Sequence, residues 1–367
     1  MRIEERVVPS ALGLDDPLLD RIFSARGITH AAQIERSLGN LLSPVDLPDI
    51  ERAAQRLADA VEQDQKILIV GDFDADGATS VALCMLALRA MGAGQVDYLV
   101  PNRFDYGYGL SPEIVQLAAT MTPDVIVTVD NGVASVDGVA LANEHGIDVI
   151  VTDHHLPGEN LPAAYALVNP NLKFSTFSSK SMAGVGVAYY LLSWVRQVLR
   201  QREYFSVRQI DEPNMAQYLD LVALGTVADV VPLDQNNRIL VHQGLQRIRR
   251  GMTRPGIMAL ARVGKRDLTT LSASDMGFAL GPRLNAAGRL QDMSVGIRCL
   301  ITEDPKEANQ LAAELDGLNQ TRREIEQDMV ADAQMILTQI QPDPDEMGIA
   351  VYHESFHQGV VGIVAGR

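Results

Sequence analysis

From Lys66 onward, short apolar runs alternate with longer amphipathic stretches, and this alternation constrains the fold more than any other feature. Four of the runs have the length of strands: 67–70, 96–100, 125–129 and 147–152. The stretches between them have the pattern of helices: 79–91, a segment after Ser111-Pro112, and 135–145. Such alternation is typical of a parallel sheet with crossover helices. We therefore predict an α/β fold with a parallel sheet of five strands, or a similar number, flanked by helices.

The regions outside this alternation favour helices. Residues 1–65 predict an amino-terminal helical cap with one helix over 49–62, and two more helices are expected at 183–200 and 214–224. Apolar residues at helical spacing predict a long connecting helix over 305–341. After a proline-containing break we expect a strand at 348–352. Because the chain stops inside a regular pattern at Arg367, we expect that further residues are missing after it.

Composition excludes several classes of protein. An apolar content of 47% with 21% charged residues excludes a disordered, collagenous or coiled-coil chain. The longest uncharged stretch has 15 residues, between Lys180 and Arg196, which is too short to span a membrane. The amino terminus carries charges of both signs with no apolar block after it, unlike a secretory signal. Two cysteines, Cys84 and Cys299, cannot build a disulfide framework, so we expect a cytoplasmic protein.

Charge is distributed unevenly along the chain. The net charge is −16, which argues against a generic nucleic-acid coat protein. Residues 238–298 nevertheless contain eleven Lys or Arg against three Asp, so this segment alone is basic. The asymmetry predicts one surface that meets an anion on an otherwise acidic body. A solvated helical face is the alternative interpretation.

Acidic and imidazole side chains follow three of the predicted strands. Asp72, Asp74 and Asp76 come after the first strand, Asp130 after the third, and Asp153-His154-His155 after the fourth. Ligands of open parallel sheets bind at the carboxyl ends of the strands, so we expect these side chains to converge. Clustered carboxylates repel one another unless cations neutralise them. Oxygen ligands with one or two imidazoles suit Mn²⁺ or Mg²⁺, and two such ions favour phosphoester hydrolysis.

Each of these groups has a structural interpretation when it is taken alone. The first resembles the start of a calcium loop, but Leu83 occupies the twelfth position where a Glu is needed. Asp130-Asn131-Gly132 alone is more often a turn, and a His-His pair is often structural. Their occurrence together at successive strand ends favours the metal site.

Taken as a set, these motifs resemble the DHH phosphoesterase superfamily. The resemblance covers residue 60 to the end of the chain and is strongest toward a branch of single-strand-specific exonucleases. Five further segments carry the likeness to that branch: 101–103, 106–110, 184–186, 225–229 and 281–289. It implies a DHH domain over 66–304, a connecting helix over 305–341 and the beginning of a DHHA1 domain over 342–367, with the active site between them. The wider superfamily has a His where this chain has Val70.

The resemblance also implies a set of metal ligands. Asp72, Asp74 and Asp130 would hold one ion, while Asp76, Asp130, His154 and Asp229 would hold the other, with Asp130 as the bridge. Asp72 supplies an extra carboxylate in this branch, which leaves open the ion that it contacts. His155 would contact the scissile phosphate or orient a ligand.

Other residues are implied to contact the substrate. Arg283, Asn285 and Arg289 lie in a Gly-rich, nearly uncharged segment, where arginine is expected to meet an anion such as phosphate. Arg103 and Tyr108 would pair with a terminal phosphate and stack on a base. Gly184 and Gly186 would let backbone approach a nucleotide, although helix packing explains this pair nearly as well. Arg367 belongs to a terminal DHHA1 motif that would help to close the cleft.

The function implied is a metal-dependent 5′ to 3′ exonuclease that degrades single-stranded DNA to 5′ mononucleotides in repair and recombination. Single-stranded DNA is the expected partner, with a single-strand-binding protein as a further one, and we expect a monomer with no membrane contact. A phosphoesterase for oligoribonucleotides, cyclic dinucleotides or pyrophosphate is the second hypothesis. A non-catalytic scaffold derived from the same fold is the third.

Overall fold

A five-stranded sheet organises the molecule. The computed structural model describes residue 8 and residues 11–102, 104, 108–339 and 347–366. All adjacent strands are parallel and follow the order β2-β1-β3-β4-β5. Their bounds are β1 Ile67–Gly71, β2 Val96–Leu99, β3 Val125–Val129, β4 Asp148–Thr152 and β5 Ala166–Val168. The predicted parallel sheet is confirmed, and β5 is a strand that the sequence pattern did not predict.

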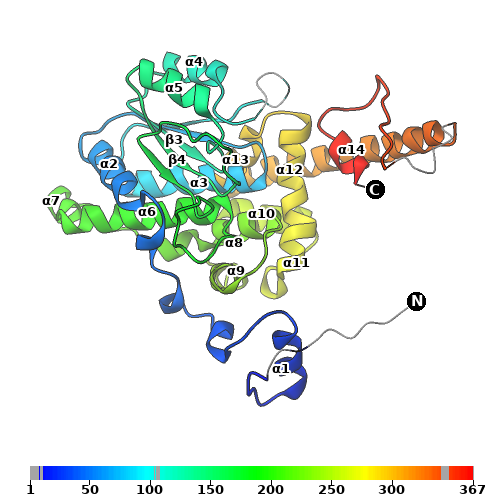
Figure 1. The fold of residues 1–367 in the computed structure, drawn as a ribbon, viewed down its shortest axis with the longest axis horizontal. Coiled ribbons are helices and arrows are strands. Elements are labelled where there is room, and N and C mark those ends of the chain that lie inside the picture. The colour runs from blue at the N-terminus through cyan, green and yellow to red at the C-terminus, as the bar shows by residue number, and fades with distance from the viewer. Residues whose placement is uncertain (1–7, 9–10, 103, 105–107, 340–346, 367) are drawn as a thin grey trace.

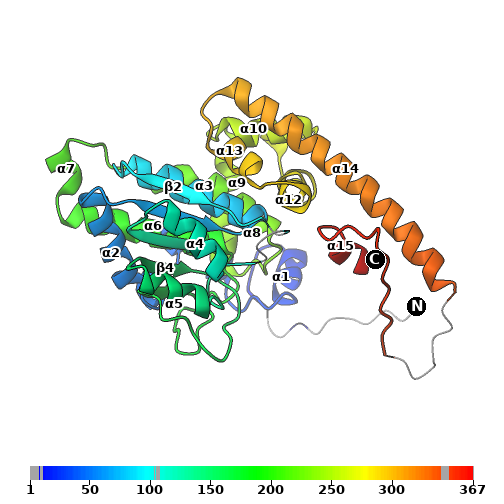
Figure 2. The same ribbon diagram turned by 90° about the horizontal axis from the view of Figure 1, so that it is seen from above.

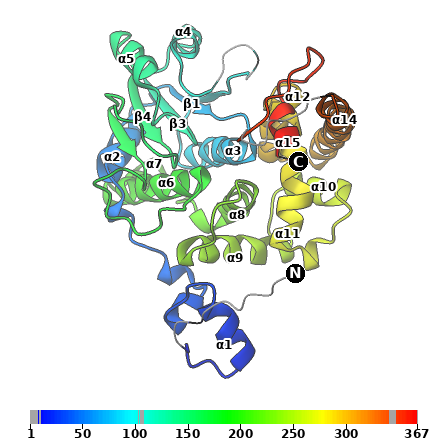
Figure 3. The same cartoon turned by 45° about the vertical axis from the view of Figure 1, so that its right-hand side comes forward.

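Helices cover both faces of this sheet (Figures 1 and 3). Helices α4 (Pro112–Thr120) and α5 (Val136–Glu144) pack on one face and enclose a small core. Helices α2 (Ile50–Glu62), α3 (Ala75–Ala90) and α6 (Gly184–Gln201) pack on the other. Because both faces are covered, β1 and β3 are buried along their whole length, which explains their continuous apolar sequences.

A second helical layer lies beyond α3 and α6. It begins with α7 Tyr204–Arg208, η4 Met215–Tyr218, α8 Leu219–Ala228, α9 Gln235–Arg249 and α10 Pro255–Val263. It continues with η5 Leu268–Thr270, α11 Ala273–Asp275, the π-helical turn η6 Met276–Leu280, α12 Gly281–Leu290 and α13 Ser294–Ile301. Helix α8 is buried over most of its length against α3, α6 and α9, so one continuous core joins the sheet to this layer.

Helix α14 (Pro305–Leu337) begins against α10 and α13 and then extends away from the body (Figure 2). Its first half is anchored by buried Leu311 and Leu315, and Met329 is buried farther along. The short helix α15 (Val361–Ala365) returns to lie beside it. The predicted long helix is therefore present, whereas the predicted strand at 348–352 is wrong: residues 347–353 form no regular element. No neighbouring strand is available there to accept its hydrogen bonds among the described residues.

The amino-terminal part is only partly helical. Helix α1 (Pro17–Ser24) and three single turns, η1 Ala31–Ile34, η2 Leu38–Asn40 and η3 Pro44–Asp46, precede α2. This segment contacts α9 rather than the sheet, since Leu42 N donates to Asn236 and Gln243 donates to the Arg36 carbonyl. In the described part of the chain, no helix is long and apolar enough to cross a membrane.

Candidate metal centre

The candidate site lies where the order of the strands in the sheet reverses. Strand β1 lies between β2 and β3; α3 connects β1 to β2 on one face of the sheet, and α4 leads from β2 back to β3 on the other. This switch point opens a crevice at the carboxyl ends of β1 and β3. Asp72, Asp74 and Asp76 follow β1 and Asp130 follows β3. The crevice therefore receives the carboxylates that the sequence places after the strands.

The β1–α3 connection presents three aspartates in five residues. Asp74 is the N-cap of α3 and accepts a hydrogen bond from Gly77 N at 2.9 Å, so the helix begins four residues earlier than predicted. Asp76 therefore lies in the first turn of α3 and is 1% exposed. Its two oxygens accept from Gly184 N at 2.7 Å and from Val185 N at 3.0 Å, at the start of α6. These bonds aim the side chain into the crevice.

Asp130 occupies an unusual backbone conformation at the end of β3. Its φ of 62° lies in the left-handed region, a conformation that costs energy for a residue other than glycine. The neighbouring Asn131 side chain donates to the carbonyls of Val70 and Val129, which ties this turn to both strands. A Cβ on Gly184 would lie 2.5 Å from Asp130 Oδ1, so only glycine leaves room for this carboxylate.

In the segment after β4, three consecutive side chains have different contacts. Asp153 is 1% exposed and accepts from Val133 N at 2.8 Å and from His155 Nδ1 at 2.7 Å. It thereby fixes the ring of His155, which stays half exposed and also contacts the Tyr108 hydroxyl at 3.2 Å. His154 instead turns inward, with Nε2 3.1 Å from Asp130 Oδ1 and 3.5 Å from Asp229 Oδ2.

Asp229 comes from outside the sheet, at the carboxyl end of α8. The structure brings the six predicted ligands together as two groups of three, and within each group the ligand atoms lie within 4.8 Å of one another. One group is Asp72, Asp74 and Asp130, and the other is Asp76, His154 and Asp229. A third combination joins Asp130 with His154 and His155. Two ions could thus be held side by side, with Asp130 between them.

The electrostatics of the cluster match this arrangement. Burial, together with the repulsion of Asp74, raises the pKa of Asp76 to about 7, and burial with the repulsion of Asp76 does the same for Asp229. Burial and the nearby Asp76 and Asp74 raise the pKa of Asp130 well above its usual value. Burial lowers the pKa of His154, which favours the neutral imidazole that ligates metals. The charged state of these carboxylates therefore needs a positive charge that the side chains do not supply.

Orphaned polar atoms test whether a metal fits. Asp130 Oδ1, His154 Nε2 and Asp229 Oδ2 are all buried, and none has a hydrogen-bond partner. Buried polar atoms are nearly always satisfied, and a missing partner often marks an ion. The donor set of carboxylate oxygens and imidazole, without thiolate, suits Mn²⁺ or Mg²⁺. The residues of this crevice therefore fit the expected pair of divalent ions.

Helix α12 supports the ligand loop from the other side of the crevice. Asn285 Oδ1 accepts from Ala75 N at 2.7 Å, so this side chain holds the backbone beside Asp74 and Asp76. Gly288 packs directly on the Phe73 carbonyl, where any Cβ would clash. Arg289 donates to the Gly359 carbonyl at 2.9 Å and links the helix to the segment before α15. The structure thus brings Asn285 to the site as a backbone support.

Several predicted contact residues lie elsewhere than expected. Arg283 forms an ion pair with Asp316 of α14 at 2.7 Å and donates to the Ala279 carbonyl, so its charge is matched within the protein. Gly184 and Gly186, which were expected to let backbone approach a nucleotide, are both buried. Gly184 leaves room for Asp130, and Gly186 packs on Met182. Arg103 and Arg367 lie outside the described residues.

The basic segment 238–298 also differs from expectation, because most of its cations have partners within the protein. Arg254 pairs with Asp220, Arg266 with Asp275, and Arg298 with Glu307. Arg249 and Arg262 donate to Leu271 and Asn309. Many of these charges therefore stabilise contacts within the second helical layer and with α14.

Sequence reasoning missed two features of the site. Asp153 was noted only as part of a motif, yet it positions His155; an acid directly before two histidines is the signal that could have indicated this role. Gly225 of α8 was part of a motif without a role. A Cβ there would lie 2.8 Å from Asp76 Oδ1, so this glycine makes room for the ligand. That requirement depends on a tertiary contact that local sequence does not reveal.

Comparisons with known proteins agree with this geometry. A family model described as the DHH family, N-terminal domain, matches residues 66–226. The single-stranded-DNA-specific exonuclease RecJ of Escherichia coli is 56% identical over 353 residues, which is 96% of this chain and 61% of the relative. The chain thus spans less than two thirds of the length of that curated relative.

Two solved structures extend the comparison. The crystal structure of exonuclease RecJ bound to manganese has a TM-score of 0.76 and 35% identity, over 89% of this chain and 78% of that one. RecJ from Thermus thermophilus in complex with Mg²⁺ has a TM-score of 0.69 and 30% identity, over 94% of this chain and 44% of that one. With the strand-end ligands and the sheet order, these matches show that the chain belongs to the RecJ branch of the DHH family.

Proposed function

We propose that this chain carries the catalytic centre of a metal-dependent 5′ to 3′ exonuclease that degrades single-stranded DNA to 5′ mononucleotides. One observation carries the proposal: buried Asp130, His154 and Asp229 converge with unsatisfied atoms at the switch point of the sheet. The relatives are named for activity on single-stranded DNA, and the solved ones contain Mn²⁺ or Mg²⁺. Work in repair and recombination, in the cytoplasm, belongs to the same proposal.

Each side chain has a defined task in this proposal. Asp72, Asp74 and Asp130 would hold one ion, and Asp76, Asp130, His154 and Asp229 the other. When bound, two such ions activate the attacking water and stabilise the charge that develops on the phosphate oxygens. The hydrogen bond that His155 donates to Asp153 raises the pKa of His155, so this half-exposed ring can carry a proton and donate it to a phosphate oxygen. The Tyr108 hydroxyl also contacts that ring.

The remaining residues would position the ligand loop and the strand. Asn285 would hold the Asp74–Asp76 backbone, and Arg289 would join α12 to the carboxyl-terminal segment. We further propose Arg103 for the terminal phosphate and Arg367 for closing the cleft. In terms of domains, residues 1–65 form the cap, 66–304 the DHH domain, 305–341 the connecting helix and 342–367 the start of a DHHA1 domain. The active unit would be a monomer, with a single-strand-binding protein as a second partner.

A nuclease assay with metal titration tests this proposal. The substrate is a long single strand labelled at its 5′ end, and a duplex and a dinucleotide are compared with it at equal nucleotide concentration. We expect no cleavage in chelator, recovery with Mn²⁺ or Mg²⁺, and early release of labelled mononucleotide from the single strand. Preference for the dinucleotide would instead indicate a small-substrate phosphoesterase. Absence of cleavage despite saturable metal binding would indicate a scaffold.

A further inference from the structure

A second cavity lies far from the metal centre, at the opposite ends of two helices that carry its ligands. It has a volume of about 770 Å³ and is lined by the last turns of α3 and α13, the first residues of α8 and α10, and the α9–α10 connection. Leu86 and Arg89 of α3 line it, ten and thirteen residues beyond Asp76. At 1.5 Å per residue, roughly 15–20 Å of helix separates the two sites.

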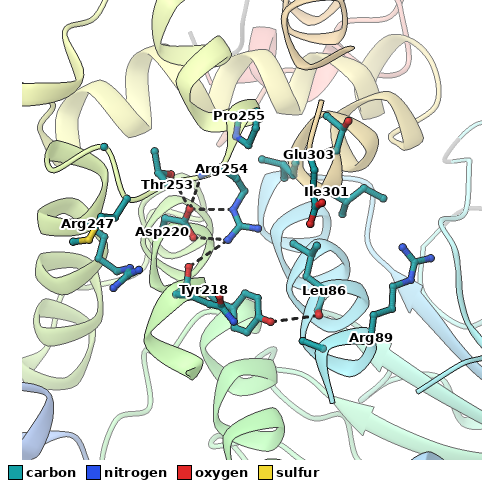
Figure 4. A pocket seen from close by; sticks show the side chains of 16 residues that line it. Leu86, Arg89, Tyr218, Asp220, Arg247, Thr253, Arg254, Pro255, Ile301 and Glu303 are labelled. Carbon is teal, nitrogen blue, oxygen red and sulfur yellow. Dashed lines mark hydrogen bonds and ion pairs between the residues drawn. The ribbon is translucent and has the colours of Figure 1, made fainter. Parts of the chain in front are cut away.

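Three arginines from different elements line this cavity: Arg89 of α3, Arg247 of α9 and Arg254 before α10. In Figure 4, Arg247 and Arg89 lie on opposite sides with Arg254 between them. They outnumber the two carboxylates of the lining, Asp220 and Glu303, of which Glu303 is exposed. A concave site with excess guanidinium groups attracts anions, especially planar or tetrahedral oxyanions.

Asp220 balances the charge of Arg254 but not the charges of Arg89 and Arg247, because its hydrogen bonds come from Arg254 and from groups adjacent in sequence to Arg254 or to Asp220 itself. It accepts from Arg254 Nε and Nη2 at 3.0 and 2.8 Å, from the Thr253 hydroxyl at 2.7 Å and from Leu221 N at 2.8 Å. Figure 4 shows this network at the centre of the cavity. It holds the Arg254 guanidinium rigidly at the cavity wall, which lowers the entropy lost when a ligand binds.

Arg247 supplies the strongest indication of a ligand. Its Nε is buried, and within the described part of the chain Arg247 makes no hydrogen bond or ion pair. Arg249, two residues along the same helix, donates to the Leu271 carbonyl instead. A buried donor on a charged group without an acceptor is costly unless a bound group completes it.

Apolar side chains lie among these cations in the lining. They are Leu86, Met252, Pro255, Leu300 and Ile301. A site that combines guanidinium groups with aliphatic side chains matches a small molecule that has both a phosphate and a flat or apolar part. The volume is within the usual range for such ligands. We propose that this cavity binds a small phosphorylated ligand of nucleotide size, separately from the metal centre.

Equilibrium dialysis in the presence of EDTA tests the proposal, because chelation removes any phosphate binding by metal. The probes are adenosine 5′-monophosphate, adenosine and inorganic phosphate. We expect saturable binding of the monophosphate, weaker binding of the other two, and a decrease of affinity as salt increases. Arg247→Gln and Arg89→Gln should each lower the affinity for the monophosphate by about tenfold, the effect of losing one charge-assisted hydrogen bond.

Two controls make the result decisive. Arg262→Gln removes one charge from α10 outside the cavity, and Asp130→Asn alters only the metal centre; both should bind the monophosphate as the unaltered protein does. Thermal unfolding checks that each variant is folded, and exposed Arg89 provides a second variant if Arg247→Gln unfolds.

Four outcomes would overturn the proposal. They are the absence of saturable binding, unaltered affinity for the monophosphate in both cavity variants, loss of that affinity in Asp130→Asn, and binding of inorganic phosphate as tight as that of the monophosphate. Binding without cleavage, or cleavage without binding, separates this inference from the proposed nuclease activity.

Discussion

Asp130 and Asp220 are both buried aspartates, yet their surroundings are opposite. Asp220 is 0% exposed and meets the Arg254 guanidinium, a hydroxyl and backbone N–H groups. Asp130 is 2% exposed and faces Asp72, Asp74, Asp76 and Asp229, with one oxygen that no donor satisfies. The protein itself supplies the countercharge of Asp220, whereas the countercharge of Asp130 must come from a bound cation.

This difference separates a structural carboxylate from a ligand by a physical criterion. A buried charge persists only if it is paired and hydrogen-bonded. At Asp220 the pairing is internal, so the group joins α8 to the start of α10. At Asp130 burial and the repelling neighbours raise its pKa, and only an added cation reverses that repulsion. Burial alone would have classed the two residues together.

The largest expected effect comes from Asp130→Asn, which tests whether this carboxylate is a shared ligand. We expect hydrolysis of single-stranded DNA to fall by at least about a thousandfold, the upper range for loss of one electrostatic contact in an active site. Stability in chelator should be equal or higher, because a repelled buried charge is removed. Steady-state rates and urea unfolding measure both. Glu144→Gln, an exposed change on α5, is the control, and near-native turnover by Asp130→Asn would exclude the bridging role.

The second prediction concerns the paired aspartate. Arg254→Leu leaves Asp220 buried without its cation, so the free energy of unfolding should fall by about 3–5 kcal/mol. The double variant Asp220→Leu with Arg254→Leu should recover most of this loss, since no unpaired charge remains. Urea denaturation of the two variants provides the comparison. If the single variant is as stable as the unaltered protein, the burial of Asp220 does not depend on its ion pair with Arg254.

The third prediction concerns metal and pH. Without metal, the raised pKa values of Asp76 and Asp229, about 7 against the ordinary 3.8, mean that the folded state binds more protons than the unfolded state between these values. Stability in chelator should therefore fall as pH rises from about 4 to about 7. Mn²⁺ at a hundred times its dissociation constant should add about 2.7 kcal/mol at neutral pH.

Differential scanning calorimetry across this pH range, with and without Mn²⁺, measures the effect. The variant Asp76→Asn with Asp229→Asn should show a flatter pH profile in chelator, because it lacks both titrating groups. A metal-free stability that rises between pH 4 and 7 would contradict the repulsion inferred for the cluster.

The smallest expected effect comes from Arg283→Gln. Because Arg283 pairs with partly exposed Asp316, we expect a loss of about 1–2 kcal/mol in stability and no change in kcat or in affinity for a single strand. Arg289→Gln is the matched comparison on the same helix. A large loss of activity in Arg283→Gln at unchanged stability would instead support the phosphate contact that the sequence context of Arg283 predicted.

Much of the site could be predicted because its ligands follow strands directly. The apolar runs before Asp72, Asp130 and Asp153 locate the strands, and parallel strands end at one edge. Arg283 and Gly186 could not be assigned in the same way. A lone arginine in a Gly-rich segment indicates an anion, but the anion proved to be Asp316 on α14. The expected strand at 348–352 failed because an apolar run forms a strand only beside a partner.

The sequence by itself indicated β1 to β4 and the residue types that follow them at the metal centre, because hydrophobic periodicity and strand-end position are local properties. Tertiary structure alone decided which groups meet. Asp229 reaches His154 from the end of α8, and Asn285 holds Ala75 across 210 residues of sequence. Likewise, Arg254 is paired with Asp220, while the buried Nε of Arg247 has no hydrogen-bond partner among the described residues. These pairings depend on how the second helical layer packs against α3, and no local pattern specifies that packing.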